Sequence, residues 1–235
     1  MRLIIAILTV AFSTGLCAQQ ASYFDPAQAY NRLLIEKSGG TYRQVGNFKV
    51  VGTSFLFGER NKGDIYAPSE SGRDIELTYD TYTQQVDFYA SSGTKIALSK
   101  DPGSLDSFII KRNPDVMLYN DILFVYGKII GSKEKAYFQL VSGGENANLY
   151  KKYSAELALV TTNILQSELK QFNINVDYYY TDSTGKNIKK LKVNAKSIAK
   201  EFSYIKDISS VIDSDLLTSQ REQELTKIFE ELNKK

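Results

Sequence analysis

The residue types that carry most enzyme chemistry are missing from this sequence. It contains no histidine and a single cysteine, Cys17. Mechanisms that rely on a Ser-His-Asp or Cys-His arrangement cannot be assembled from such a chain, and zinc, haem and iron–sulfur sites lose their usual ligands. Oxygen ligands remain, so a calcium site and a carboxylate-based hydrolysis are the chemistries left to consider.

Two groups of acidic residues invite comparison with a cation site. Asp177, Asp182 and Asn187 surround a turn, but a calcium loop needs carboxylates at alternating positions and a closing Glu, and that pattern is absent. Asp213 and Asp215 precede the last helical stretch, where negative charge stabilises a helix N-terminus. We therefore predict no metal-binding and no cofactor-binding residues.

A glycan hydrolase needs two carboxyl groups that flank the scissile bond. Glu76 and Asp87 occupy alternate positions of two expected strands, where exposure to solvent explains an acidic residue. Nothing in the sequence singles out a pair, so no catalytic residue is predicted. A carboxylate-dependent hydrolase acting on glycan is kept as an alternative function.

Tyr178, Tyr179 and Tyr180 form the most conspicuous aromatic run. Successive side chains of a strand point to opposite faces, so we expect Tyr178 and Tyr180 to face the core and Tyr179 to face solvent. An exposed tyrosine ring can stack on a sugar or on a partner protein, which makes Tyr179 the candidate binding residue. The lysines from Lys186 to Lys192 follow this strand, and on an edge hairpin they are expected to block edge-to-edge pairing.

Residues 1–18 have the layout of a secretory signal peptide. A positive start is followed by an apolar run over 3–12, which is shorter than the roughly 20 residues that span a bilayer. We expect cleavage after Ala18, with cleavage after Gln19 as the second choice. The alternative is a lipoprotein signal, which would make Cys17 the lipid-bearing N-terminus.

This signal predicts an exported protein, in the periplasm, on the cell surface or outside the cell, with no transmembrane segment in the mature chain. The 29 basic and 27 acidic residues leave a formal net charge of +2, which provides no general attraction for nucleic acid. Nucleic acid is therefore not expected as a partner. Loss of Cys17 with the signal leaves no thiol for a disulfide, so packing alone must stabilise the fold.

Short apolar runs separated by turn signals fill residues 46–193. Ile75, Leu77 and Tyr79 alternate with polar residues, as is typical of a half-buried strand. The run from Ile122 to Tyr126 is apolar on both faces and is the expected central strand. Short strands at this spacing predict an antiparallel sheet, as a meander or a sandwich-like arrangement.

After residue 193 the apolar period lengthens towards that of a helix. Asn194 is a suitable N-cap, and Ser219 with Glu222 has the spacing of a capping box before the last helix. The apolar stripe of that helix is predicted to contain Leu225, Ile228, Phe229 and Leu232.

The fold class predicted from these patterns is α+β, mainly antiparallel β with C-terminal helices. The expected organisation is a signal peptide over 1–18 and an N-terminal arm over 19–45. A β-rich domain over 46–193 follows, and helices over 194–235 pack on the same module.

A resemblance is carried by residues 63–66, 75–80, 86–89 and 149–153, and by the hairpin over 178–193 with the helices expected after it. Residues 75–80 end in Leu-Thr-Tyr-Asp and lead to the short strand at 86–89, and residues 149–153 read Leu-Tyr-Lys-Lys-Tyr. Over residues 55–235 the chain resembles exported proteins of the Bacteroidetes, a family of unknown function, although Leu is usual there at the position of Tyr150. The resemblance implies export and a single module, and it brings no activity and no site residues.

The function that these observations favour is that of an exported, non-enzymatic module. It is expected to bind another component of the bacterial envelope, protein or glycan, or to stabilise an assembly. Enzymatic activity is the less expected outcome. The two alternatives are the glycan hydrolase and an envelope lipoprotein anchored at Cys17.

Overall fold

The computed structural model describes residues 42–45, 48–89, 95–97, 105–159 and 169–234, and the chain divides into two compact units. The expected cleavage site at Ala18 and Gln19, and also Cys17, lie outside the described residues. In the smaller unit, β1 (Tyr42–Val45) and β2 (Phe48–Val51) form an antiparallel pair. β2 also pairs in parallel with the first residues of β11 (Leu169–Asp182).

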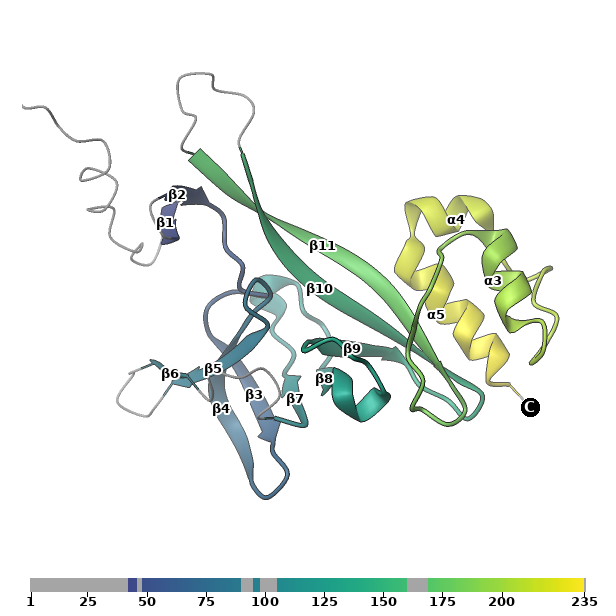
Figure 1. Cartoon of the computed structure of the whole chain (residues 1–235), viewed down its shortest axis with the longest axis horizontal. Coiled ribbons are helices and arrows are strands. Elements are labelled where there is room, and N and C mark those ends of the chain that lie inside the picture. Colours follow the sequence, from purple (N-terminus) through teal and green to yellow (C-terminus); the bar gives the residue numbers. More distant parts are fainter. Residues whose placement is uncertain (1–41, 46–47, 90–94, 98–104, 160–168, 235) are drawn as a thin grey trace, which may run out of the picture. The chain divides into compact units, whose positions relative to one another are not determined.

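The larger unit comprises residues 53–158 and 172–235. Its other strands are β3 (Asn61–Tyr66), β4 (Ser71–Asp80), β5 (Gln85–Tyr89), β6 (Lys95–Ala97), β7 (Ser107–Ile110), β8 (Ile122–Tyr126), β9 (Tyr137–Ser142), β10 (Ala147–Leu159) and β12 (Lys189–Lys190). They follow the order β11-β10-β9-β8-β7-β3-β4-β5-β6 (Figure 1). β12 pairs with β11 off this path.

The predicted α+β class with a mainly antiparallel sheet is confirmed. The registers defined within this unit are all antiparallel. The expected central strand is β8, which lies between β7 and β9. Of its residues, Phe124 is completely buried and the others are half-buried. The alternation of apolar and polar residues located the strands because one face of each strand lies against a core.

An aromatic core fills the space enclosed by this curved sheet. The far part of β10 returns to the end of β4, where Ala155 donates its backbone N–H to the carbonyl of Thr81 at 3.1 Å. Within the enclosure the rings of Phe108 and Phe124 stack at a centroid distance of 4.7 Å, and Tyr79 packs against both. The aromatic core consists of Leu56, Leu77, Tyr79, Val86, Leu105, Phe108, Ile110, Leu118, Phe124, Tyr137 and Tyr153.

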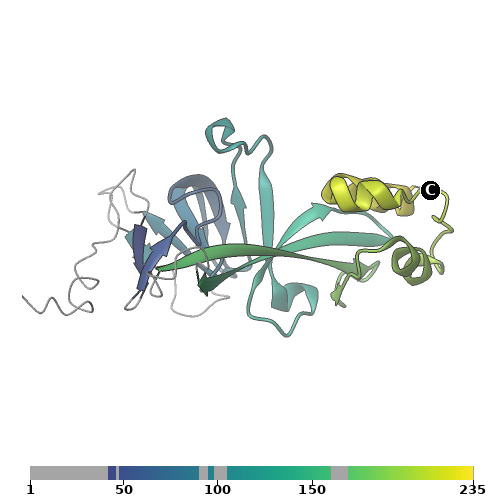
Figure 2. The same ribbon diagram turned by 90° about the horizontal axis from the view of Figure 1, so that it is seen from above.

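A second core lies between the other end of the sheet and the C-terminal helices. These are α3 (Ala195–Phe202), α4 (Ser214–Ser219) and α5 (Arg221–Leu232), and they lie beside the end of the β10–β11 ribbon in both ribbon views (Figures 1 and 2). The helical core consists of Ala147, Leu149, Tyr178, Tyr180, Leu191, Ile198, Phe202, Ile208, Leu217, Leu225, Ile228, Phe229 and Leu232. The predicted apolar stripe of the last helix is thus confirmed.

The opposite face of these strands is covered as well. The short 3-10 helix η2 (Gly127–Ile130) precedes β9, and Ile130 packs with Phe138, Tyr150 and Tyr179 in a third, smaller cluster. A further 3-10 helix, η1 (Pro114–Val116), lies between β7 and β8. Because both faces are covered at this end of the sheet, consecutive residues of β11 are buried.

The helix starts agree with the sequence in one case and differ in another. Asn194 caps α3 as predicted, and its Oδ1 accepts the backbone N–H of Ser197 at 2.8 Å. The predicted capping box at Ser219 is wrong, because Ser219 ends α4 and donates its hydroxyl to the carbonyl of Asp215. α4 and α5 follow each other with only Gln220 between them. Glu222 instead reaches a lysine of the sheet.

Candidate anion-binding site

A pocket of about 390 Å³ lies between β12 and α3. We call it the lysine pocket, because four of its lining residues are lysines. It is lined by Tyr180, Lys189, Lys190, Leu191, Lys192, Ser197, Lys200 and Glu201.

The strand side of the lysine pocket is set by the register of β12 on β11. Lys189 lies opposite Tyr180, and Lys190 lies opposite Tyr179. Residues directly opposite in an antiparallel pair share a face, so Lys189 lies with Tyr180 on the face that the helices cover. Lys190 lies on the other face, where its ammonium pairs with Asp177 at 2.8 Å.

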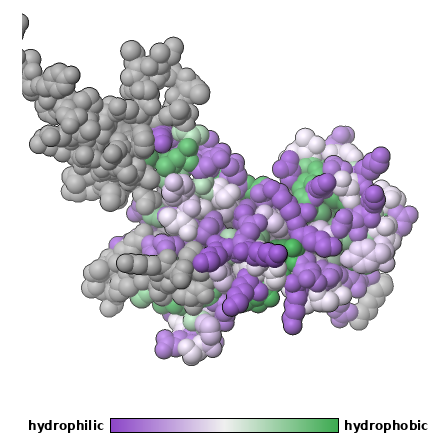
Figure 3. Space-filling model, viewed as in Figure 1, coloured by the Kyte–Doolittle hydropathy of each residue, from purple (hydrophilic) through white to green (hydrophobic). Residues whose placement is uncertain are grey.

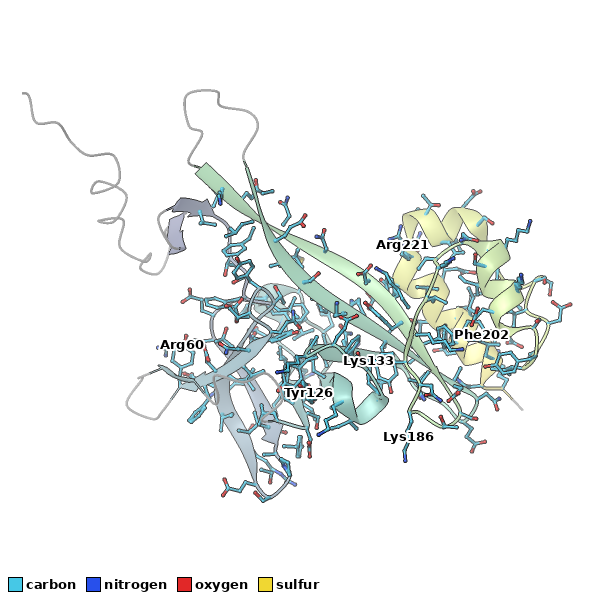
Figure 4. The ribbon with its side chains drawn as sticks, viewed as in Figure 1. Arg60, Tyr126, Lys133, Lys186, Phe202 and Arg221 are labelled. Atoms are coloured by element: carbon cyan, nitrogen blue, oxygen red, sulfur yellow. The ribbon has the colours of Figure 1, made fainter. Side chains whose placement is uncertain are left out.

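The helix side comes from one stripe of α3. Ser197 and Lys200 are three residues apart and therefore lie on one face of the helix. α3 is held against the sheet by Phe202, whose ring meets that of Tyr180 at 4.9 Å and that of Phe229 at 5.2 Å. Figure 4 labels Phe202 at this contact between α3 and its neighbours. The helical core thus fixes the distance between the two walls of the pocket.

The charges in the lysine pocket do not balance. Among the described residues, Lys189, Lys192 and Lys200 form no ion pair within 4 Å. Lys189 lies 5.9 Å from the centre of the Tyr180 ring, and its charge contributes, after the hydrogen bonds of that turn, to lowering the pKa of Asp182. The pocket holds one acid, Glu201, and its carboxylate accepts a hydrogen bond from the Tyr180 hydroxyl. Burial, and then this hydrogen bond, raise the pKa of Tyr180, so its hydroxyl keeps the proton that it donates. Three lysines against one occupied carboxylate favour a negatively charged ligand.

A neighbouring pocket of about 360 Å³ lies at the turn that joins β11 to β12. We call it the Tyr204 pocket. It is lined by Asn146, Asp182, Ser183, Tyr204 and Ile205. Hydrogen bonds from Thr184 hold the pKa of Asp182 below its usual range, so this carboxyl group is ionised at neutral pH. In Figure 3 the surface around the helical end of this unit is mostly hydrophilic.

Besides the two pockets, an ion pair lies between the two large cores. Lys151 of β10 lies between Leu149, in the helical core, and Tyr153, in the aromatic core. Its ammonium is 2.5 Å from Oε2 of Glu222 at the start of α5 and 4.8 Å from the centre of the Tyr153 ring. The Lys151 side chain is 9% exposed and that of Glu222 is 43% exposed. We treat this pair as structural, because it joins α5 to the sheet.

The expected exposure of Tyr179 is wrong. This residue is 6% exposed, its ring packs edge-on against Phe138 at 5.1 Å, and its hydroxyl donates to Glu134. The third hydrophobic cluster covers the face that alternation alone assigns to solvent. A ring packed in this way cannot offer its face to a ligand, so we do not retain Tyr179 as a binding residue.

The acidic groups singled out in the sequence have local roles. Asp182 accepts hydrogen bonds from Thr184 in the turn, and Asp177 pairs with Lys190. Asp213 is the N-cap of α4 and accepts the backbone N–H groups of Asp215 and Leu216. The described residues contain no cluster of three or more potential metal-binding side chains.

The two pockets each hold one carboxylate, Glu201 in the first and Asp182 in the second. Glycoside hydrolysis requires a pair of acids, which here would have to come from both pockets together, as Glu201 and Asp182. Sequence reasoning missed the lysine pocket because two segments form it. The lysines of residues 186–192 were visible, but nothing local indicates that Ser197 and Lys200 face them.

Comparison with family models, with curated proteins and with solved structures finds no match to this chain. In the described part of the chain, no helix is long and apolar enough to cross a membrane.

Proposed function

We propose that this chain is an exported, non-enzymatic binding module that holds an anionic group of a bacterial envelope component in the lysine pocket. The observation that carries the proposal is the excess of positive charge in that pocket. Lys189, Lys192 and Lys200 face one carboxylate, and Tyr180 already occupies that carboxylate with a hydrogen bond. The predicted signal peptide and the resemblance to exported Bacteroidetes proteins support the envelope location.

Lysine suits this role because its ammonium is a compact charge with three donors on a flexible stem. The lysines of the pocket are exposed, so water screens them and binding must weaken as ionic strength rises. A ligand with one anionic group is expected to bind weakly. A multivalent envelope polymer would gain affinity from repeated contacts.

Inorganic phosphate is the simplest probe of the pocket. In a titration followed by NMR at low salt, we expect saturable shifts of the backbone amides near Ser197 and Lys200. Replacing Lys189 and Lys200 together by Gln should weaken binding by tenfold or more, because two of the three unpaired charges are lost.

The control is Lys62→Gln, to be compared with Lys189→Gln and Lys200→Gln made singly, so that each variant loses one charge. Lys62 is an exposed lysine of β3 whose ammonium lies 3.8 Å from Glu76, and its replacement removes one positive charge outside the pocket. Its phosphate affinity should stay within twofold of that of the unaltered protein. Equal weakening in the control and the pocket variant, or the absence of saturation, would refute the proposed anion site.

Export is tested separately by intact mass and fractionation in a bacterial host. A species that begins at Gln19 or Gln20 in the soluble envelope fraction is expected. A membrane-bound species that begins at an acylated Cys17 would replace the free module by an anchored one. An uncleaved cytoplasmic protein would contradict the envelope location.

A further inference from the structure

The lysine pocket and the Tyr204 pocket lie along one seam between the hairpin and α3. On the helix side, Ser197 and Glu201 line the first pocket and Tyr204 lines the second, three residues after Glu201. On the strand side, Tyr180 lines the first pocket and Asp182 the second, two residues along the same strand. Each wall of the lysine pocket therefore leads, within two or three residues, to a residue that lines the Tyr204 pocket.

The border between the pockets is a connected group of side chains. The hydroxyl of Tyr180 donates to Glu201. Partial desolvation, and then the negative charges of Asp182 and Glu201, raise the pKa of Tyr204. The residues that line the two pockets are thus neighbours along both segments, Tyr180 with Asp182 and Glu201 with Tyr204.

The Tyr204 pocket has the chemical character that a sugar ring requires. Tyr204 is 68% exposed, and its ring offers an apolar face with a polar tip. Asp182 is ionised and can accept hydrogen bonds from sugar hydroxyls, and Ser183 can donate and accept. The Nδ2 of Asn146 donates a hydrogen bond to the carbonyl of Leu232, and its Oδ1 can act as an acceptor.

We propose that the ligand of this module is an acidic saccharide, with its anionic group in the lysine pocket and the adjoining sugar ring on Tyr204. This inference rests on the proposed anion-binding function and specifies its ligand class. Neutral sugars lack the charge that the lysines recognise, and simple anions lack the ring that Tyr204 and Asp182 recognise. Both parts of the ligand are needed for full affinity.

Four probes separate the contribution of the anionic group to affinity from that of the sugar ring. They are inorganic phosphate, glucose, glucose 6-phosphate and glucuronic acid, each titrated against the full chain by calorimetry or NMR. We expect at least one of the two acidic sugars to bind tenfold or more tightly than inorganic phosphate, and glucose to bind most weakly. The two acidic sugars distinguish a phosphorylated saccharide from one built on uronic acid.

Tyr204→Ala should lower the affinity for the acidic sugar to that for inorganic phosphate. Its phosphate affinity should stay within twofold of that of the unaltered protein. Tyr204→Phe keeps the ring and should retain most of the advantage of the acidic sugar over phosphate. The matched control is Tyr119→Ala, because Tyr119 is equally exposed, at 70%, but lies before β8 and away from both pockets. This control should leave both affinities unchanged.

The possible failures of the two proposals are distinguishable. If inorganic phosphate and the acidic sugars all fail to bind, the anion-binding function itself is refuted. If phosphate binds and neither acidic sugar binds better, the anion site stands and the saccharide inference is overturned. The inference is also overturned if Tyr204→Ala keeps the full sugar advantage, or if Tyr119→Ala loses it to the same degree.

Discussion

The ion pair between Lys151 and Glu222 gives a quantitative test of how α5 is held on the sheet. Glu222→Gln removes the negative charge and keeps the size of the side chain. The ammonium of Lys151, which is 9% exposed, then lacks its ionic partner. Breaking a fully buried pair costs about 3–5 kcal/mol.

Two features of the site reduce this cost. Glu222 is 43% exposed, so water already screens the pair, and the Tyr153 ring continues to face the ammonium at 4.8 Å. We therefore expect Glu222→Gln to lower the free energy of unfolding by about 1.5 kcal/mol, below the range for a fully buried pair.

The lysine side of the pair should respond differently. Lys151→Met replaces the ammonium by an apolar group of similar length and leaves Glu222 in contact with water, so the loss should stay below about 1 kcal/mol. The double variant contains no buried charge and should be more stable than Glu222→Gln alone. The decisive result is therefore the order of the three variants, with Glu222→Gln the least stable.

Urea unfolding followed by circular dichroism measures these differences. Glu230→Gln, at an exposed position of the same helix, is the control and should change stability by less than about 0.5 kcal/mol. A loss of stability for Glu222→Gln no larger than that of this control would show that the ion pair does not hold α5 on the sheet. The reasoning is also refuted if Lys151→Met proves the more damaging change, or if the double variant is no better than Glu222→Gln.

Three further predictions concern pH and one tight turn. Hydrogen bonds from Lys206 and Lys234 lower the pKa of Glu231 from 4.5 to about 2. The ionised carboxylate therefore stabilises the fold fully above pH 4.5, and this stabilisation is lost as pH falls towards 2. Glu231→Gln should accordingly reduce the loss of stability at acid pH, measured as the free energy of unfolding against pH. Burial, and then the charge of Glu222, raise the pKa of Tyr178 from 10.0 to about 12. The protonated hydroxyl therefore stabilises the fold fully below pH 10, and this stabilisation is lost as pH rises towards 12. Tyr178→Phe should reduce that loss in unfolding measurements at alkaline pH. Gly131 has a φ of +78°, and a Cβ there would lie 1.6 Å from the carbonyl oxygen of Lys186. Gly131→Ala should therefore lower the free energy of unfolding in urea by at least about 2 kcal/mol. A urea midpoint equal to that of the unaltered protein would contradict the described turn.

The features that the sequence predicted correctly are those with a local signal. Ile75, Leu77 and Tyr79 alternate because one face of β4 contacts a core, and Asn194 caps α3 through a hydrogen bond to a residue three positions away. The helical stripe that contains Phe229 follows from its spacing alone. Such features depend on nearest neighbours, so one sequence is sufficient to find them.

The features that the sequence missed depend on what covers each surface. Tyr179 is buried because Ile130 and Phe138, from other segments, cover the second face of the sheet. The capping box at Ser219 fails because α4 extends to that residue. The lysine pocket requires α3 to pack beside β12, and no local pattern of charged residues predicts that contact.

The sharing of β10 between two cores has a consequence for the way the chain acquires its structure. Leu149 lies in one core and Tyr153 in the other, four residues apart on the same strand. Other residues of the first core, such as Phe202 and Phe229, follow β10 and β11 in the chain and are synthesised after them. Until they emerge, one side of the nascent sheet is an exposed apolar surface of the kind that promotes aggregation. A chaperone would therefore be most useful to this protein in the interval between completion of β11 and arrival of the C-terminal helices.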